Sequence, residues 1–329
     1  MKRYSKKKLF SAAAAVAAMA VAAVVAWQLV PLSADAMRGS AVVVEQASWH
    51  EVCIDGKARL YFSDSTGDSV LLGVTANRDS ALHRRRMAGC WVNRWALVPS
   101  CMGRIATVYS AAPAVPRIKG DSTIARLCRQ SIATQLKTLK TQKSELGYYL
   151  RVHGVQDNGY QAIAALASRA DAAYNDVARA GRLLDSLTAT GSHRLTIDSR
   201  TAYTAVFRST GGKTLRERLV VAGSDRKARV MTLRTADGKT PAGASPLSVT
   251  PWSVSPRRGI LAVGYPGLGE QGLECDTVAP AVVPGILTAD SRHDLPRLLA
   301  ADGAPVFTMR GRFVGIVSGD KVLRRVRIY

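Results

Sequence analysis

The chain has 329 residues, of which 47% are hydrophobic and 21% are charged, a balance typical of a globular protein and not of a disordered one. Its 46 lysines and arginines against 24 aspartates and glutamates give a formal net charge of +22, which favours anionic partners. No dense basic block follows the N-terminus, so we interpret most of this charge as a solvated surface.

The N-terminus predicts a membrane segment. The first eight residues, MKRYSKKK, carry five positive charges, and residues 9–32 carry none. About 20 apolar residues suffice to cross a bilayer, and basic residues before such a run stay in the cytoplasm. We therefore predict that residues 1–36 form a cytoplasmic basic tip and a membrane anchor. The bulk of the chain would then be exported, as a single-pass periplasmic protein of the cell envelope.

A cleaved signal peptide is the alternative reading of the same segment. Ala34, Asp35 and Ala36 form an A-x-A site, and cleavage after Ala36 would make the protein secreted. Against cleavage, the apolar run exceeds the roughly 7–15 residues of a usual signal core. We favour the uncleaved anchor.

Cysteines and histidines do not predict a metal centre. The five cysteines are Cys53, Cys90, Cys101, Cys128 and Cys275, and an odd number leaves at least one of them unpaired within the chain. No C-x-x-C spacing occurs, and the five histidines are isolated. We therefore expect no metal and no cofactor.

Two types of periodicity follow one another along the exported part. Residues 41–110 contain short β-branched or aromatic runs separated by turn residues, which predicts strands. From about Gly120 the apolar residues recur at steps of three and four up to Leu150, and they do so again from Tyr160 to Leu187. This spacing predicts two helices, and the break HGVQDNG between them predicts an antiparallel hairpin.

Strand-like runs return after Gly191, and many short strands with regular turns suggest a barrel or a sandwich. The simplest organisation is one β unit formed by residues 37–119 and 190–329. The helical hairpin, residues 120–189, would then be an insertion in this unit.

The C-terminal part resembles trypsin-like serine proteases of the chymotrypsin fold. GILAVGYPG is followed by GAPVF at Gly303–Phe307 and by a hairpin that contains GRFVGIV. The segment AGCWVNRWALVPSCM, Ala88–Met102, resembles the strand and loop that carry the histidine of this family. The resemblance implies a mainly β protein, a trypsin-like double β-barrel, and the helical hairpin lies outside the family pattern.

The catalytic positions implied by this resemblance do not hold a triad. Asp302 occupies the position of the nucleophilic serine, and Cys101, or Ser100 after a shift of one, occupies that of the histidine. The orienting aspartate falls on Lys227 or Ala228, with Asp225 nearby but displaced. A triad needs a nucleophile, a base in contact with it and an orienting carboxylate, so we assign no catalytic residue to these degenerate positions.

The oxyanion hole implied by the resemblance is altered as well. Its donors would be the backbone N–H groups of Ala300 and Asp302. A carboxylate beside a developing oxyanion would repel it.

Other chemistries receive less support. Cys101 could act as a nucleophile, but no histidine neighbours it in sequence. Asp302 could activate water only if Asp290 or Asp294 folded back onto it. The group DSRHD contains Ser291, His293 and Asp294, yet triad members come from distant segments, so we interpret it as an exposed loop.

The sequence therefore predicts a pseudoprotease that acts in binding or scaffolding. Its expected partner is a peptide or protein in the former substrate cleft or along the helical hairpin, besides the membrane contact through residues 9–32. Few aromatic residues accompany the basic ones, which makes nucleic acid an unfavoured partner. The alternative is an active trypsin-like endopeptidase with an atypical active site.

Overall fold

The computed structural model describes residues 19, 31–66, 70–93, 102–189, 193–208, 212–249, 259–268, 279–324 and 326. By its internal contacts the chain divides into two compact units. Unit 1 comprises Met1–Gln46, Arg85–Ser110 and Ala202–Tyr329, and unit 2 comprises Ala47–Arg84 and Ala111–Thr201. Three strands contribute residues to both units: β1 (Ala41–Ile54), β5 (His83–Val92) and β7 (Leu195–Arg208).

Unit 1 contains a closed barrel of six strands. In the order β1, β5, β6, β9, β8, β7 each strand pairs with the next, and β7 pairs back with β1. The remaining barrel strands are β6 (Arg104–Val108), β8 (Thr214–Asp225) and β9 (Val230–Thr235). A short helix, α2 (Ala34–Ser40), precedes β1 and is capped by the hydroxyl of Ser33, which accepts a hydrogen bond from the N–H of Ala36.

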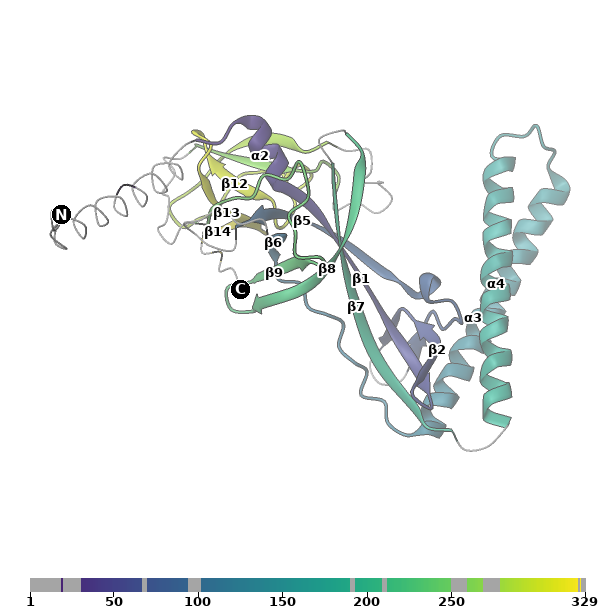
Figure 1. The fold of residues 1–329 in the computed structure, drawn as a ribbon. Helices are drawn as coiled ribbons and strands as arrows, with labels where there is room; N and C mark the ends of the chain where they lie inside the picture. The colour runs from purple at the N-terminus through teal and green to yellow at the C-terminus, as the bar shows by residue number, and fades with distance from the viewer. Residues whose placement is uncertain are drawn as a thin grey trace, which may run out of the picture. The chain divides into compact units, whose positions relative to one another are not determined.

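A five-stranded antiparallel sheet completes unit 1 (Figure 1). Its strands, in spatial order, are β11 (Ala281–Ile286), β10 (Gly259–Gly264), β12 (Pro305–Thr308), β13 (Phe313–Ser318) and β14 (Lys321–Leu323). Strand β10 pairs with β11 through Ala262↔Val283, and β12 pairs with β13 through Pro305↔Ile316. The turns before β12 and after β13 carry the residues of the candidate site.

Alternation along the barrel strands explains why their sequence is apolar on both faces. Val42 and Val44 pack in the cluster inside the barrel, together with Trp91 and Leu233. Val43, between them, packs in a second cluster that joins the barrel to the five-stranded sheet. Successive side chains of a strand point to opposite faces, so the run AVVV fills two cores at once.

Unit 2 pairs two long helices with short strands. Its further elements are β2 (Lys57–Phe62), β3 (Asp64–Thr66), β4 (Val70–Leu72), the 3-10 helix η1 (Arg78–Ala81), α3 (Asp121–Val152) and α4 (Tyr160–Ala189). The first turns of α3 bury Ile124 and Cys128, and α4 buries Leu184, against Leu60 and Phe62 of β2. The helices therefore share one hydrophobic core with strands that precede them in the chain.

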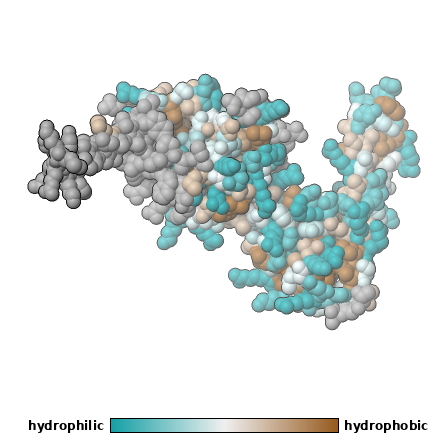
Figure 2. All heavy atoms as spheres, viewed as in Figure 1, coloured by the Kyte–Doolittle hydropathy of each residue, from teal (hydrophilic) through white to brown (hydrophobic). Residues whose placement is uncertain are grey.

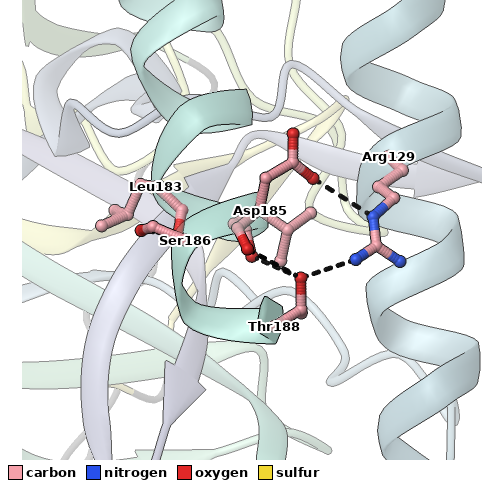
Figure 3. A network of polar contacts seen from close by, with 6 residues as sticks. Arg129, Leu183, Asp185, Ser186 and Thr188 are labelled. Atoms are coloured by element: carbon pink, nitrogen blue, oxygen red, sulfur yellow. Dashed lines mark hydrogen bonds and ion pairs between the residues drawn. The ribbon is translucent and has the colours of Figure 1, made fainter. Parts of the chain in front are cut away.

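Polar contacts fix α3 beside α4. The guanidinium of Arg129 donates to a carboxylate oxygen of Asp185 at 3.4 Å and to the hydroxyl of Thr188 at 2.7 Å (Figure 3). Nearer the loop between the helices, Lys143 pairs with Asp171 at 2.7 Å and lies over the ring of Tyr174. Exposed pairs of this kind contribute little each, so the helical pair depends mainly on its buried face.

That buried face ends before the loop between the helices. Tyr148, Val152, Val155 and Leu166 are exposed, and Figure 2 shows hydrophobic residues among hydrophilic ones at this end of the pair. The regular apolar period that predicted the helices thus continues beyond the residues that form a core.

The predicted mainly β architecture with an antiparallel helical pair is confirmed. Of the two expected barrels, the described residues form one closed barrel and an open five-stranded sheet. The sequence predicted that residues 120–189 form a separate insertion. By their internal contacts, however, α3 and α4 belong to the same unit as Ala47–Arg84.

No helix within the described residues is long and apolar enough to cross a bilayer. Most of the run 9–32 lies outside the described residues, so the anchor stays a prediction.

Leu184→Ala should destabilise unit 2 by about 2–5 kcal/mol, because Leu184 is fully buried in the core shared by α4 and the strands. Leu166→Ala is the matched control, since this leucine of α4 is 47% exposed and its truncation should cost less than about 0.5 kcal/mol. Urea unfolding followed by circular dichroism measures both. Equal losses in the two variants would contradict the assignment of the core.

Candidate functional site

The Asp302 loop, residues 300–304, is the place where the sequence resemblance puts the nucleophile. Gly303 adopts a φ of +92°, and a Cβ at this position would lie 1.8 Å from the carbonyl oxygen of Ala88. Only glycine fits such a close approach in this backbone region. The glycine of GAPVF is therefore required by the packing of the loop on β5.

Backbone hydrogen bonds hold this loop on both sides. The N–H of Ala88 in β5 donates to the carbonyl of Asp302 at 2.9 Å. The N–H of Gly303 donates to the carbonyl of Val317 in β13 at 2.8 Å, and the N–H of Val317 donates to the carbonyl of Ala304 at 2.9 Å. The loop is thus fixed by main-chain groups between the barrel and the five-stranded sheet.

The side chain of Asp302 has a partner of its own. Its Oδ1 accepts a hydrogen bond from the N–H of Gly319 at 2.7 Å, and the residue is half-buried. A carboxylate oxygen that accepts from a backbone amide is fixed in position by that hydrogen bond. It therefore acts as a fixed acceptor that ties the Asp302 loop to the β13–β14 turn.

The N–H of Ala300 is also occupied. It donates to the carbonyl of Pro296 at 2.9 Å within the preceding turn, and Ala300 is buried. An oxyanion hole needs N–H donors that point at the position where negative charge develops. In this arrangement the amide that the resemblance assigns to that role serves the fold of its own turn.

Asp225, the displaced candidate for the orienting carboxylate, closes the turn between β8 and β9. Its Oδ1 accepts a hydrogen bond from the N–H of Ala228 at 2.9 Å, and Arg229 adopts a φ of +57° in the same turn. Ala228 and Lys227 lie within this turn. Ser100 and Cys101, the candidates for the base, lie outside the described residues.

His293 lies next to the strand turn that Asp302 contacts. Its backbone N–H donates to the carbonyl of Asp320, the residue after Gly319, at 3.1 Å. Its ring Nδ1 accepts from the N–H of Leu295 at 3.2 Å, which places the proton of the neutral ring on Nε2. Burial lowers the pKa of His293, while the charges of Asp320 and Asp294 act in the opposite direction. These contacts hold His293 in a structural position.

The other members of the group DSRHD also serve the local fold. Asp294 accepts from the N–H of Ile286 at 2.6 Å, and Asp290 accepts from the hydroxyl of Thr288 at 2.5 Å. Ser291 adopts a φ of +68° and its carbonyl accepts from the N–H of Val322. The segment is an ordered loop that bridges to β14.

Unit 2 contains a serine–histidine contact that sequence reasoning missed. His50 Nδ1 lies 2.6 Å from the Oγ of Ser199, and the histidine ring stacks on Phe62 with the ring centroids 4.7 Å apart. His50 is only 2% exposed, and burial lowers its pKa while the charge of Asp64 raises it. The two residues are 149 positions apart on β1 and β7, so no local motif could reveal the pair.

The described cysteines are buried thiols. Cys53, Cys90 and Cys128 are free, and burial raises the pKa of all three, that of Cys128 to about 12. A thiol becomes a nucleophile only as the thiolate, so these three are chemically inert at neutral pH. Among the described residues no three His, Cys, Asp or Glu side chains gather in a way that could hold a metal ion.

Unit 2 also holds a cavity of about 380 Å³ between α3, α4 and the segment after β4. Thr134, Gln135, Thr138 and Gln142 line it from α3, and Asp176 lines it from α4. Leu139 and Val177 form part of its apolar surface. An apolar surface with a few polar groups is the usual lining of a binding site.

Comparison with known proteins gives the following. No protein-family model matches the chain, and no curated protein matches it by sequence. Among solved structures, it is similar to the crystal structure of Deg5, with a TM-score of 0.32 and 10% identity, over 83% of this chain and 78% of that one. It is also similar to the apo MamO protease domain from Magnetospirillum magneticum, with a TM-score of 0.27 and 19% identity, over 37% of this chain and 68% of that one.

Asp302→Ala should destabilise unit 1 by about 1 kcal/mol, because the N–H of Gly319 loses its acceptor. Asp302→Asn keeps an oxygen at the same position and should lose less. Hydrogen exchange measured by NMR should show faster exchange of the Gly319 amide in the alanine variant alone. An unchanged Gly319 amide in both variants would refute this contact.

His50 should make unit 2 less stable as the pH falls. Its pKa in the folded chain lies below the unfolded value of about 6.5, so below that pH the unfolded chain binds the proton first. The melting temperature should therefore drop between pH 7.5 and pH 5.5, and by less in His50→Gln, which can still accept from Ser199. Identical pH profiles for the two proteins would contradict this assignment.

Proposed function

We propose that this protein is a non-catalytic trypsin-like protein of the cell envelope, held in the membrane by residues 9–32 and acting through binding. The observation that carries the proposal is the use of the catalytic positions by the fold itself. The carboxylate of Asp302 accepts from Gly319, and the N–H of Ala300 donates to Pro296. A group engaged in this way is not available to attack a carbonyl or to stabilise an oxyanion.

Retention of the anchor is supported by the contacts of the residues that follow it. The carbonyl of Ser33 accepts from the N–H of Met37 at 2.9 Å, and the side chain of Met37 is buried in unit 1. Leu32 is partly buried against the core that joins the barrel to the five-stranded sheet. Cleavage after Ala36 would remove Leu32 from the core of unit 1 and remove Ser33, the cap of α2. It would leave the buried Met37 as the new N-terminus. We therefore infer that the segment stays attached.

For the binding role we propose a peptide or protein partner that occupies the cavity of unit 2 along the helical pair. The hydroxyls of Thr134 and Thr138 donate to carbonyls of their own helix and can still accept, and the amide of Gln142 can both donate and accept, which suits a peptide backbone. The apolar surface of Leu139 and Val177 beside them suits an uncharged side chain. Partner binding of this kind requires no catalytic group.

The full chain, purified in detergent, should not react with a serine-directed fluorophosphonate and should not hydrolyse peptides, because no nucleophile occupies position 302. Trypsin labelled in the same detergent is the positive control. Asp302→Ser should remain unlabelled as well, since the N–H of Ala300 still donates to Pro296.

Three outcomes would contradict the proposal, each in a different way. Peptidase activity lost in Asp302→Ala would return the chemistry to this loop. Activity lost in Cys101→Ser would assign it to the cysteine. Labelling that disappears in Ser199→Ala would place a hydrolase site in unit 2, at the contact with His50.

A further inference from the structure

The β12–β13 turn, residues 308–312, is a rigid projection of unit 1. The N–H of Gly311 donates to the carbonyl of Thr308 at 2.8 Å, and the N–H of Thr308 donates to the carbonyl of Arg312 at 2.8 Å. The hydroxyl of Thr308 also accepts from the N–H of Arg312 at 3.1 Å. These bonds fix the direction in which the side chains of the turn point.

This turn is in direct contact with the end of the apolar N-terminal run. The N–H of Leu32 donates to the carbonyl of Gly311 at 3.2 Å. Gly311 has a φ of +75°, and a Cβ there would lie 2.4 Å from the carbonyl oxygen of Leu32. The absence of a side chain at position 311 is therefore what allows Leu32 to lie on the turn.

The turn exposes one apolar side chain and two basic ones, a combination that suits a partner with an apolar interior and an anionic surface. Met309 is 60% exposed, although it is one of the large apolar side chains of unit 1. Arg310 and Arg312 follow it in the same turn and are both exposed. Among the described residues no carboxylate forms an ion pair with either arginine, so both guanidinium groups can bind an anion outside the chain.

The sequence places a bilayer surface close to this turn. Residues 9–30, which precede the non-helical Pro31 and Leu32, would span about 33 Å as a helix, slightly more than the roughly 30 Å hydrocarbon core. Trp27 stands five residues before Leu32, and tryptophan is enriched at the level of the lipid headgroups. Leu32 would then leave the bilayer at the headgroups, with the turn in contact with it.

We propose that the β12–β13 turn is a lipid-contact surface that binds anionic phospholipid headgroups. Arg310 and Arg312 bind phosphate oxygens, to which a guanidinium can donate two hydrogen bonds, and the neighbouring Met309 enters the interfacial region. The surface rests on the proposed anchoring by residues 9–32. Lipid is favoured over a protein partner because Leu32, bonded to Gly311, ends the segment that enters the bilayer.

Photo-crosslinking of the full chain in vesicles tests this surface. Benzoylphenylalanine replaces Met309 in one protein and Val221, a 52% exposed residue of β8 in the same unit, in the control. The vesicles contain phosphatidylglycerol and phosphatidylethanolamine, or phosphatidylcholine alone. With phosphatidylglycerol, lipid adducts at position 309 should exceed those at position 221 at least five-fold.

Charge removal separates the arginines from the general positive charge of the chain. Arg310→Gln/Arg312→Gln should lower adducts at position 309 at least three-fold in phosphatidylglycerol vesicles. Lys213→Gln/Arg218→Gln removes the same charge from exposed residues at and before β8 and should leave the yield unchanged. An equal effect of the two double variants would overturn the role of the two arginines.

Flotation of the same samples after a carbonate wash distinguishes this surface from the anchor. A chain that floats but gives equal adducts at positions 309 and 221, or only protein adducts at 309, overturns the lipid surface and leaves the anchor intact. A chain that does not float overturns the anchor and the surface together. Flotation with selective lipid adducts at 309 supports both.

Discussion

The close contact between Gly303 and Ala88 is the constraint on which the candidate site depends. The loop that follows Ala300 must pass over β5 so closely that a Cβ at position 303 would overlap a carbonyl oxygen. The bonds that hold the loop to Ala88 on one side and to Val317 on the other join main-chain atoms. The side chain at position 302 takes no part in them. The course of the loop between β5 and β13 therefore depends on these main-chain bonds and not on which side chain stands at position 302.

The side chain of Asp302 adds a further hydrogen bond to this loop. Its Oδ1 accepts from the N–H of Gly319, and this bond links the turn before β12 to the turn after β13. The shorter side chain of a serine at the same position would not extend as far toward Gly319. The same logic holds at Asp225 and Asp294, where carboxylates near the expected catalytic positions accept from the backbone of their own loops. Each of these acids is explained by local stability, without reference to a substrate.

Local patterns predicted the elements, because each pattern reports on burial. Short β-branched runs such as AVVV predicted strands, which in the structure fill two cores, and the three-and-four spacing predicted α3 and α4. The grouping of the helices with β2 was not predictable, since Phe62 and Leu184 are far apart in sequence and meet only in the folded core. The contact of His50 with Ser199 was missed for the same reason. The resemblance found the Asp302 loop, but the acceptor role of its carboxylate depends on where Gly319 lies.

Anchoring changes what a small surface such as the β12–β13 turn can achieve. An arginine near an anionic bilayer gains about 1 kcal/mol, which would be too little to recruit a free protein through two side chains. A protein already tethered beside the bilayer does not pay the entropy of association again, so the second contact is effectively intramolecular. Two arginines and one methionine then suffice to orient the turn, although they could not localise the chain. In the proposed arrangement the net charge of +22 would attract the whole molecule to the same surface over a longer range, but this attraction is screened within about 8 Å at physiological salt. The orientation would therefore be decided by the groups nearest the end of the proposed anchor, which are those around Gly311.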